Sequence, residues 1–294
     1  LIDEYQDISP QRYELIKELL KKNKNGKLFC VGDDWQSIMG FTGSNLKYFT
    51  HFREYFDKPE RTDLETNYRS DKSIVALSKR IIEQNGDSQL KKKTEANSKK
   101  EGIVKFYSSE IKNKTLIETI NYYSQVAEHC MKEILKLKEE GYGWGDILIL
   151  RRINPPTARM TQILYEMAGK YEIPLSEDSH NPQTVSLLTI HKSKGLQAKV
   201  VFIIGLDKGI YGFPNELQSP DILIPACRDK QEKKEEEERR LFYVAVTRAK
   251  EKLYIYYQQC CKSKFIEEMN PPIKPEFVKD TINEPKVVYS KKER

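Results

Sequence analysis

The first seven residues, LIDEYQD, place two adjacent carboxylates directly after an apolar pair. Sheets that hydrolyse nucleotides hold a metal ion where an apolar strand ends in carboxylates, so Asp3 would bind Mg²⁺ and Glu4 would orient the attacking water. The other interpretation is that Asp3, Glu4 and Asp7 only favour the N-terminus of the next helix through its dipole. On these residues alone the two interpretations are equally supported.

A phosphate-binding loop of the form G-x-x-x-x-G-K-[ST] does not occur in the 294 residues. A second candidate stretch is VGDDWQSIMGFTGS at 31–44, where Gln36 would lie at the same sheet edge as Asp3. Phe41 stands among small residues and would offer a platform for a nucleic-acid base, because every base has a face that stacks. Taken alone, a core Phe beside a turn is the better-supported interpretation.

Two later stretches add polar and cationic groups. In LETNYRS, Tyr68 and Arg69 put a flat ring beside a cation, which suits an adenine and a phosphate, although an ordinary surface pair is commoner. The loop after the apolar run that ends in TIH offers hydroxyl and cationic donors that would grip a backbone phosphate: Thr189, His191, Lys192, Ser193 and Lys194.

Arg248 lies near the end of an apolar helical segment in EEERRLFYVAVTRAKEKL at 236–253. A cation there would reach the γ-phosphate held by a neighbouring domain. The run of Glu and Arg residues that precedes it is interpreted as a solvated helix face.

Alternating strands and helices must position these groups. We expect a helix after Ser9-Pro10 with one apolar face that includes Leu15 and Leu19, and a buried strand at 27–33. The later elements are a helix at 73–85, a strand at 103–109, a helix at about 115–140, a strand at 146–152, a helix at about 155–168, strands at 185–191 and 199–206, and a helix that runs into a strand at 241–257. This alternation predicts an α/β protein with parallel sheets.

Composition sets broader limits. The 50 basic and 44 acidic residues give a net charge of +6, which permits a polyanionic partner without requiring one. The five cysteines form no C-x-x-C pair, so a zinc site or a disulfide framework is not indicated. No signal peptide or membrane-spanning run is evident, so we expect a cytoplasmic protein without a membrane partner. The polar, Lys-rich stretch at 87–101 is expected to be a flexible surface loop, and the chain after about 270 to be loosely held.

Together and in this order, five stretches resemble the UvrD/Rep-type DNA helicases of superfamily 1: D-E-Y-Q-D, G-D-D-x-Q-S-I, N-Y-R-S, T-I-H-K-S-K-G-L and Y-V-A-V-T-R-A. VGDDWQ, KGLQAKVVFIIGL and GFP at 212–214 look closest to the helicase IV branch. The resemblance implies RecA-like parallel sheets with flanking helices, as in P-loop NTPase helicases, with the first lobe incomplete and the second essentially complete. It divides the chain into the end of the first RecA-like domain at 1–60, the second at 61–260 and a C-terminal tail at 261–294.

The resemblance also implies roles, with ATP and Mg²⁺ as cofactors and single-stranded DNA as partner. Asp3 would hold Mg²⁺, and the catalytic groups would be Glu4, Gln36, Arg69 and Arg248. Tyr68 would stack on adenine and Gly195 and Gln197 would approach the ribose, while Phe41, Thr189, His191 and Ser193 would contact DNA. Two positions depart from the family: Gln197 replaces a frequent Glu, and Thr42 replaces an Arg beside the aromatic residue.

In this family the phosphate loop precedes D-E-x-Q-D, so we expect the chain to be the C-terminal part of a longer helicase and to be inactive alone. The missing N-terminal part of the parent chain would then be a partner. The parent would be an ATP-driven translocase on single-stranded DNA, moving 3′ to 5′ by resemblance. The alternative is a non-catalytic module that binds single-stranded DNA. A helicase fused to a nuclease is not supported, because no nuclease-like carboxylate cluster follows Tyr257.

Overall fold

The central sheet of the described chain has seven parallel strands in the order β5-β6-β4-β7-β8-β3-β9. The computed structural model describes residues 1–23, 25–109, 116–152, 159–209, 212–216, 230–269 and 276–277. The strands of the sheet are β3 (Ile103–Ser109), β4 (Ile147–Arg151), β5 (Leu175–Ser176), β6 (Val185–Thr189), β7 (Ala198–Ile204), β8 (Ala249–Gln258) and β9 (Glu276–Phe277). Parallel strands need crossover connections, most of which contain helices here, and the predicted α/β class is confirmed.

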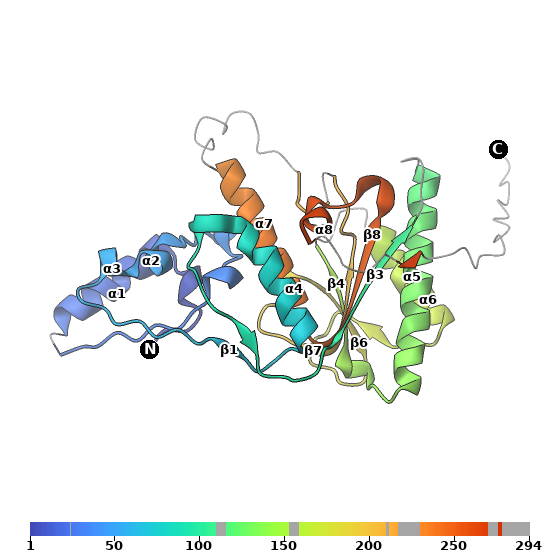
Figure 1. Cartoon of the computed structure of the whole chain (residues 1–294), viewed down its shortest axis with the longest axis horizontal. Coiled ribbons are helices and arrows are strands. Elements are labelled where there is room, and N and C mark those ends of the chain that lie inside the picture. Colours follow the sequence, from blue (N-terminus) through green and yellow to red (C-terminus); the bar gives the residue numbers. More distant parts are fainter. Residues whose placement is uncertain are drawn as a thin grey trace, which may run out of the picture.

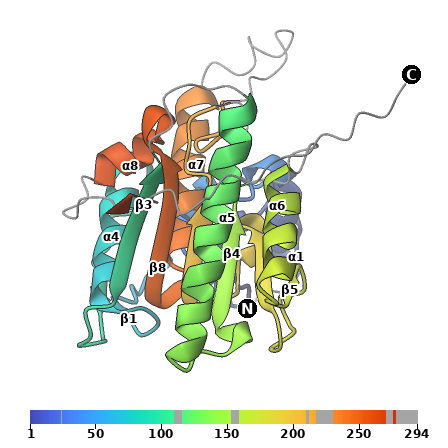
Figure 2. The same ribbon diagram turned by 90° about the vertical axis from the view of Figure 1, so that its right-hand side faces the viewer.

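Helices cover both faces of this sheet (Figures 1 and 2). One face carries α4 (Lys72–Ile82), α7 (Lys230–Val246) and α8 (Lys264–Met269); the other carries α5 (Leu116–Glu139) and α6 (Arg159–Lys170). Strand β4 serves both cores, because Leu148 and Leu150 pack with the first set of helices and Ile147 and Ile149 with the second. Burial on both faces explains why the strand sequences are continuous apolar runs. Within the ranges given above, no helix is long and apolar enough to cross a membrane.

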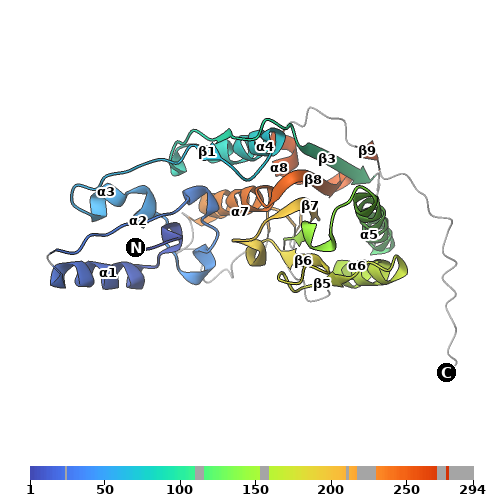
Figure 3. The same cartoon turned by 90° about the horizontal axis from the view of Figure 1, so that it is seen from below.

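A smaller unit formed by residues 1–56 lies beside the sheet, at the left of Figure 3. It contains α1 (Pro10–Lys22), α2 (Lys47–Thr50) and α3 (Phe52–Tyr55). The predicted start of α1 is confirmed, because Ser9 caps it by accepting a hydrogen bond from the Arg12 backbone N–H at 3.4 Å. The unit is held together by aromatic rings, among them Tyr13, which stacks on Tyr48 with 4.4 Å between ring centroids.

One expectation for this unit is wrong, and another is met in part. Residues 27–33 do not form a buried strand: they pair with the N-terminus through a parallel bridge between Ile2 and Cys30 and through the Tyr5 N–H, which donates to the Val31 carbonyl at 2.9 Å, and the Phe29 side chain is 65% exposed. The predicted apolar face of α1 is partly covered: Tyr13 is buried, whereas Leu15 and Leu19 are 61% and 58% exposed. Within the described residues, nothing packs over Leu15 and Leu19 deeply enough to bury them. Residues 27–33 and the N-terminal residues form only one pair of extended segments, which lacks the neighbouring strands that make a stable sheet.

The Lys-rich stretch at 87–101 is more structured than expected. Its strand β2 (Glu95–Ala96) pairs in parallel with β1 (Thr66–Asn67). The Leu90 backbone N–H donates to Asp34 at 2.7 Å, and Lys92 forms ion pairs with Asp33 and Asp34. Ion pairs of Lys92, which was expected to face solvent, therefore hold this stretch against the 31–44 segment.

The Glu and Arg run at the start of the α7 apolar segment is also not a solvated face. Glu238, Arg239 and Arg240 are 6%, 4% and 7% exposed. Two of these charges are paired internally: Glu238 with Arg152, and Arg239 with Glu268 on α8 at 2.8 Å. Arg240 donates from Nε to the Ser37 carbonyl at 2.8 Å. Buried charged groups are stabilised by such partners, which a count of charges along the sequence does not reveal.

The large core reaches across both proposed domain limits. Ile38, from the first 60 residues, is fully buried among residues of α4, α7 and the sheet. At the other end, Phe265, Ile266 and Met269 of α8 are buried in the same core, so the stretch expected to be a tail from 261 begins as an integral helix. Most of the expected loose tail, 278–294, lies outside the described residues.

A buried histidine gives the fold a testable pH dependence. Burial lowers the pKa of His129 on α5 to about 4, and its Nδ1 lies 2.8 Å from the hydroxyl of Tyr256. The unfolded chain, with an ordinary pKa of about 6.5 at this residue, binds the extra proton between these two values, so stability falls as the pH falls through that window. The expected loss from pH 7 to pH 4 is about 2–3 kcal/mol, since one pKa unit corresponds to about 1.4 kcal/mol.

Urea unfolding at several pH values measures this loss. His129→Gln keeps a partner for Tyr256 but does not titrate, so its stability is expected to depend less steeply on pH. His180→Gln is the matched control, because His180 is exposed. Equal slopes for His129→Gln and the unmodified chain would contradict the assignment.

Candidate functional site

The two N-terminal carboxylates lie on an irregular turn. The Glu4 backbone is left-handed, with φ 52° and ψ 38°, a conformation that residues other than Gly, Asn and Asp seldom adopt. The Asp3 carboxylate accepts a hydrogen bond from the Glu4 backbone N–H at 2.8 Å. Both side chains are exposed. The turn therefore aims two carboxylates outward instead of burying them, as a site for a metal ion and a water requires.

Lys194 contacts this turn from the second unit. Its Nζ lies 3.2 Å from Glu4 Oε2, forms an ion pair with Asp7, and donates to the backbone carbonyl of Gln36 at 3.1 Å. Burial raises the pKa of the Asp7 carboxyl, and the charge of Lys194 opposes that rise. From the sequence, Lys194 was a donor for a DNA phosphate. The structure instead pairs the Lys194 side chain with carboxylates at the proposed hydrolytic site.

Three of the predicted catalytic residues converge. Arg248 Nη2 donates to Gln36 Oε1 at 3.2 Å, and Arg69 Nη1 donates to the backbone carbonyl of Thr247 at 3.4 Å. The Arg248 side chain is only 1% exposed and also donates to the Leu196 carbonyl at 3.0 Å. Burial, and then the nearby charge of Arg69, lower the pKa of Arg248 to about 10, so it stays charged at neutral pH. Two cations and an amide thus meet where the two units touch.

The predicted nucleotide contacts border this cluster. Tyr68 is 79% exposed and precedes Arg69, whose backbone N–H donates to the Asn67 side chain at 2.9 Å. An exposed ring on a fixed turn is free to stack on a base. Gly195 has a left-handed φ of 84°, with open space where a side chain would stand, and Gln197 is exposed beyond it.

The predicted DNA contacts are only partly brought together. Phe41 is 72% exposed and meets the ring of His191 edge to face, with 5.4 Å between ring centroids. Thr189 is half-buried and accepts from the Lys192 backbone N–H at 3.3 Å. Ser193 is fully buried, and its hydroxyl donates to the Ile190 carbonyl at 2.7 Å. The expected contact of the Ser193 side chain with DNA is therefore not available in this structure; the residue shapes the loop.

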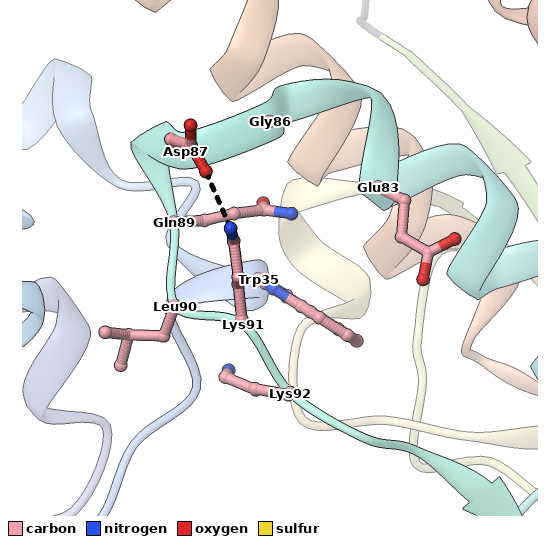
Figure 4. A pocket seen from close by; sticks show the side chains of 8 residues that line it. All are labelled: Trp35, Glu83, Gly86, Asp87, Gln89, Leu90, Lys91 and Lys92. Carbon is pink, nitrogen blue, oxygen red and sulfur yellow. Dashed lines mark ion pairs between the residues drawn. The ribbon is translucent and has the colours of Figure 1, made fainter.

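A cavity of about 350 Å³ lies next to this region but outside it (Figure 4). Its lining residues are Trp35, Glu83, Gly86, Asp87, Gln89, Leu90, Lys91 and Lys92. Lys91 and Asp87 form an ion pair at 3.1 Å across its mouth. None of the residues predicted to bind nucleotide or DNA lines this cavity, so it is not the candidate site.

Known proteins resemble this chain over most of its length. DNA helicase IV of Escherichia coli K12 is 35% identical over 272 residues, which is 91% of this chain and 35% of that protein. The ATP-dependent DNA helicase PcrA of Staphylococcus epidermidis RP62A is 32% identical over 178 residues, covering 59% of this chain and 21% of the relative. PcrA of Staphylococcus aureus Mu50 is 31% identical over the same length. The chain thus spans about a third, or less, of the length of these relatives.

Two family models match separate parts of the chain. The UvrD/REP helicase N-terminal domain matches residues 1–57, and the UvrD-like helicase C-terminal domain matches residues 157–260. The first match contains the carboxylate turn and Gln36, and the second contains Lys194 and Arg248. The resemblance inferred from the five motifs is confirmed: the chain belongs to the UvrD/Rep-type family of DNA helicases.

Proposed function

We propose that this chain forms part of an ATP-dependent DNA helicase that translocates on single-stranded DNA, with 3′ to 5′ as the expected direction. One observation carries the proposal: Arg248 of the second unit donates to Gln36 of the first, beside Arg69. Hydrolysis of ATP between two lobes needs cations on the developing charge of the γ-phosphate and a polar side chain that senses it. We infer that residues 1–60 and 61–260 supply these two lobes.

Glu4 would act as the base that orients the attacking water, and Asp3 would hold Mg²⁺. When bound, Mg²⁺ neutralises charge on the phosphates and orients them. The donor set fits this ion, because Mg²⁺ in nucleotide sites commonly takes one or two carboxylates and completes its shell with phosphates and water. In the described part of the chain, no group of three or more His, Cys, Asp or Glu residues is placed to hold a metal ion.

The remaining roles are those that the resemblance to the helicase family implies. Tyr68 would stack on the adenine, with Gly195 and Gln197 near the ribose. Phe41 would stack on a DNA base, as aromatic side chains do for single strands. Thr189 and His191 would contact the DNA next to it. A DNA substrate agrees with the cytoplasmic location expected from the sequence.

Steady-state ATPase measurements with saturating oligothymidylate test the proposal. This chain contains no glycine-rich phosphate loop, so we expect no turnover by it alone. A chain extended upstream through its reading frame to include such a loop is expected to be faster by about 10³-fold or more, judging from the cost of removing a single phosphate-binding cation. DNA binding without ATP turnover in the extended chain would instead favour a non-catalytic binding module. Comparable turnover by the unextended chain would show that the phosphate loop is not needed.

A further inference from the structure

Hydrogen bonds connect α7 and the turn after it to the segment that carries Gln36 and Phe41. Two of the bonds come from α7 and one from Arg248, the second residue after the helix, and they reach successive points of this segment. The three contacts are Arg248 Nη2 to Gln36 Oε1 at 3.2 Å, Arg240 Nε to the Ser37 carbonyl at 2.8 Å, and the Gly40 backbone N–H to Glu237 Oε1 at 2.9 Å. The predicted γ-phosphate residue Arg248 thus lies two residues beyond the C-terminal end of α7, and Glu237 lies about 14 Å before that end along the helix axis.

The contact between Glu237 and Gly40 depends on the absence of a side chain at residue 40. A side chain at residue 40 would place its Cβ 2.7 Å from Glu237 Oε2, so the carboxylate would have to move away from its present position. Burial raises the pKa of Glu237, and the hydrogen bond from Gly40 is the largest influence that opposes this rise. Bonds from a backbone N–H to a carboxylate are among the stronger hydrogen bonds in proteins.

This bond fixes a turn that has little support of its own. Gly40–Thr42 is a single 3₁₀ turn closed by the Gly43 N–H on the Gly40 carbonyl at 3.0 Å, and such short turns are weak in isolation. Phe41, in the middle of the turn, is 72% exposed and meets only the edge of His191 among aromatic rings of the described chain. The direction of the Phe41 ring therefore depends on what holds Gly40.

We propose that Glu237 is a positioning residue that sets the Phe41 turn for stacking on a base of single-stranded nucleic acid. This inference rests on the proposed function, since it takes Phe41 as a base platform. Glu237 lies on α7, and Arg248 follows the C-terminal end of this helix by two residues. The helix therefore connects the base platform to the phosphate-sensing residue. A movement of Arg248 on nucleotide binding is then transmitted to Gly40.

Binding of a fluorescein-labelled oligothymidylate to this chain, followed by anisotropy, tests the inference. Glu237→Ala removes the acceptor and is expected to weaken binding about tenfold. A loss of this size is within the range expected when one stacking contact between a base and an aromatic ring is lost. Glu237→Gln keeps an acceptor of the same length and should bind within about twofold of the unmodified chain. Glu236→Ala, which removes a neighbouring charge on the same helix, is the matched control and should also stay within about twofold.

Two further measurements separate positioning from a general loss of structure. Hydrogen exchange at the Gly40 amide is expected to accelerate in Glu237→Ala and to stay slow in Glu237→Gln, with unfolding midpoints reported for each variant. Adding Glu237→Ala to Phe41→Ala should weaken binding no further than Phe41→Ala alone, because the two act through one contact.

The possible failures are distinguishable. If Glu237→Ala binds DNA as tightly as the unmodified chain while Phe41→Ala is weakened, the positioning role is overturned and the proposed function stands. Additive losses in the double variant, or equal losses in Glu237→Gln and Glu237→Ala, would also overturn it. If the unmodified chain binds no oligothymidylate, the proposed DNA contacts themselves are contradicted.

Discussion

Replacing Arg248 with Ala in a chain that hydrolyses ATP is expected to lower the DNA-stimulated turnover by about 10³–10⁵-fold. The side chain is nearly fully buried and is the cation that bridges to Gln36, so in the proposed site its loss would remove positive charge where charge would develop on the γ-phosphate. Steady-state ATPase with saturating oligothymidylate measures the effect. Arg248→Lys should recover only a small part, because an ammonium cannot reproduce the fixed set of donors of a guanidinium.

The control for this variant must address folding. Arg248 also donates to the carbonyls of Val244 and Leu196, at 2.9 and 3.0 Å, and those acceptors lose a partner. Unfolding midpoints and oligothymidylate affinity should therefore be measured beside turnover. Arg53→Ala removes an exposed arginine of α3 and should leave all three unchanged. A folded Arg248→Ala variant that retains a tenth of the turnover would be incompatible with the assigned role.

Replacing Glu4 with Gln is expected to cost about 10²–10⁴-fold in turnover, the usual contribution of a positioned general base. The amide keeps the size of the side chain but cannot accept a proton from the attacking water. ATP affinity should change by less than about threefold, because Glu4 would act on the water and not on the nucleotide. Single-turnover ATPase and equilibrium nucleotide binding, measured on the same preparation, separate these effects.

The change also removes half of an ion pair, since Lys194 lies 3.2 Å from Glu4. Asp7 keeps Lys194 in place, so the lobe contact should survive. Glu14→Gln on the exposed side of α1 is the matched control and should be indistinguishable from the unmodified protein. Loss of ATP binding in Glu4→Gln, or turnover within twofold of normal, would argue against Glu4 as the base.

The second unit was predictable from the sequence because its elements are long and strongly patterned. The expected helix at about 115–140 is α5 (Leu116–Glu139), and the strand at 103–109 has those bounds in the structure. Buried parallel strands leave continuous apolar runs, which are hard to mistake when helices alternate with them. Short elements such as β5 and β2, two residues each, carry no such pattern and were missed.

The failures share one physical cause, which is that burial and pairing depend on residues far away in the sequence. Leu15 and Leu19 have the spacing of a buried face, yet they are exposed. Arg240 stands in a charged run, yet it is buried against the Ser37 carbonyl. Lys194 was expected to face a DNA phosphate, and its pairing with Glu4 and Asp7 could not be deduced from spacing alone.

The insertion of the 36–40 segment into the core has a consequence for synthesis of the protein on the ribosome. The bond between Gly40 and Glu237 spans 197 positions of the chain, and Ile38 is buried by residues of α7 and β8 that emerge equally late. At about 5–20 residues per second, translation needs roughly 10–40 s to supply those partners. During that interval Ile38 and Met39 have no core to enter, so the nascent chain carries an apolar segment that chaperones are suited to shield.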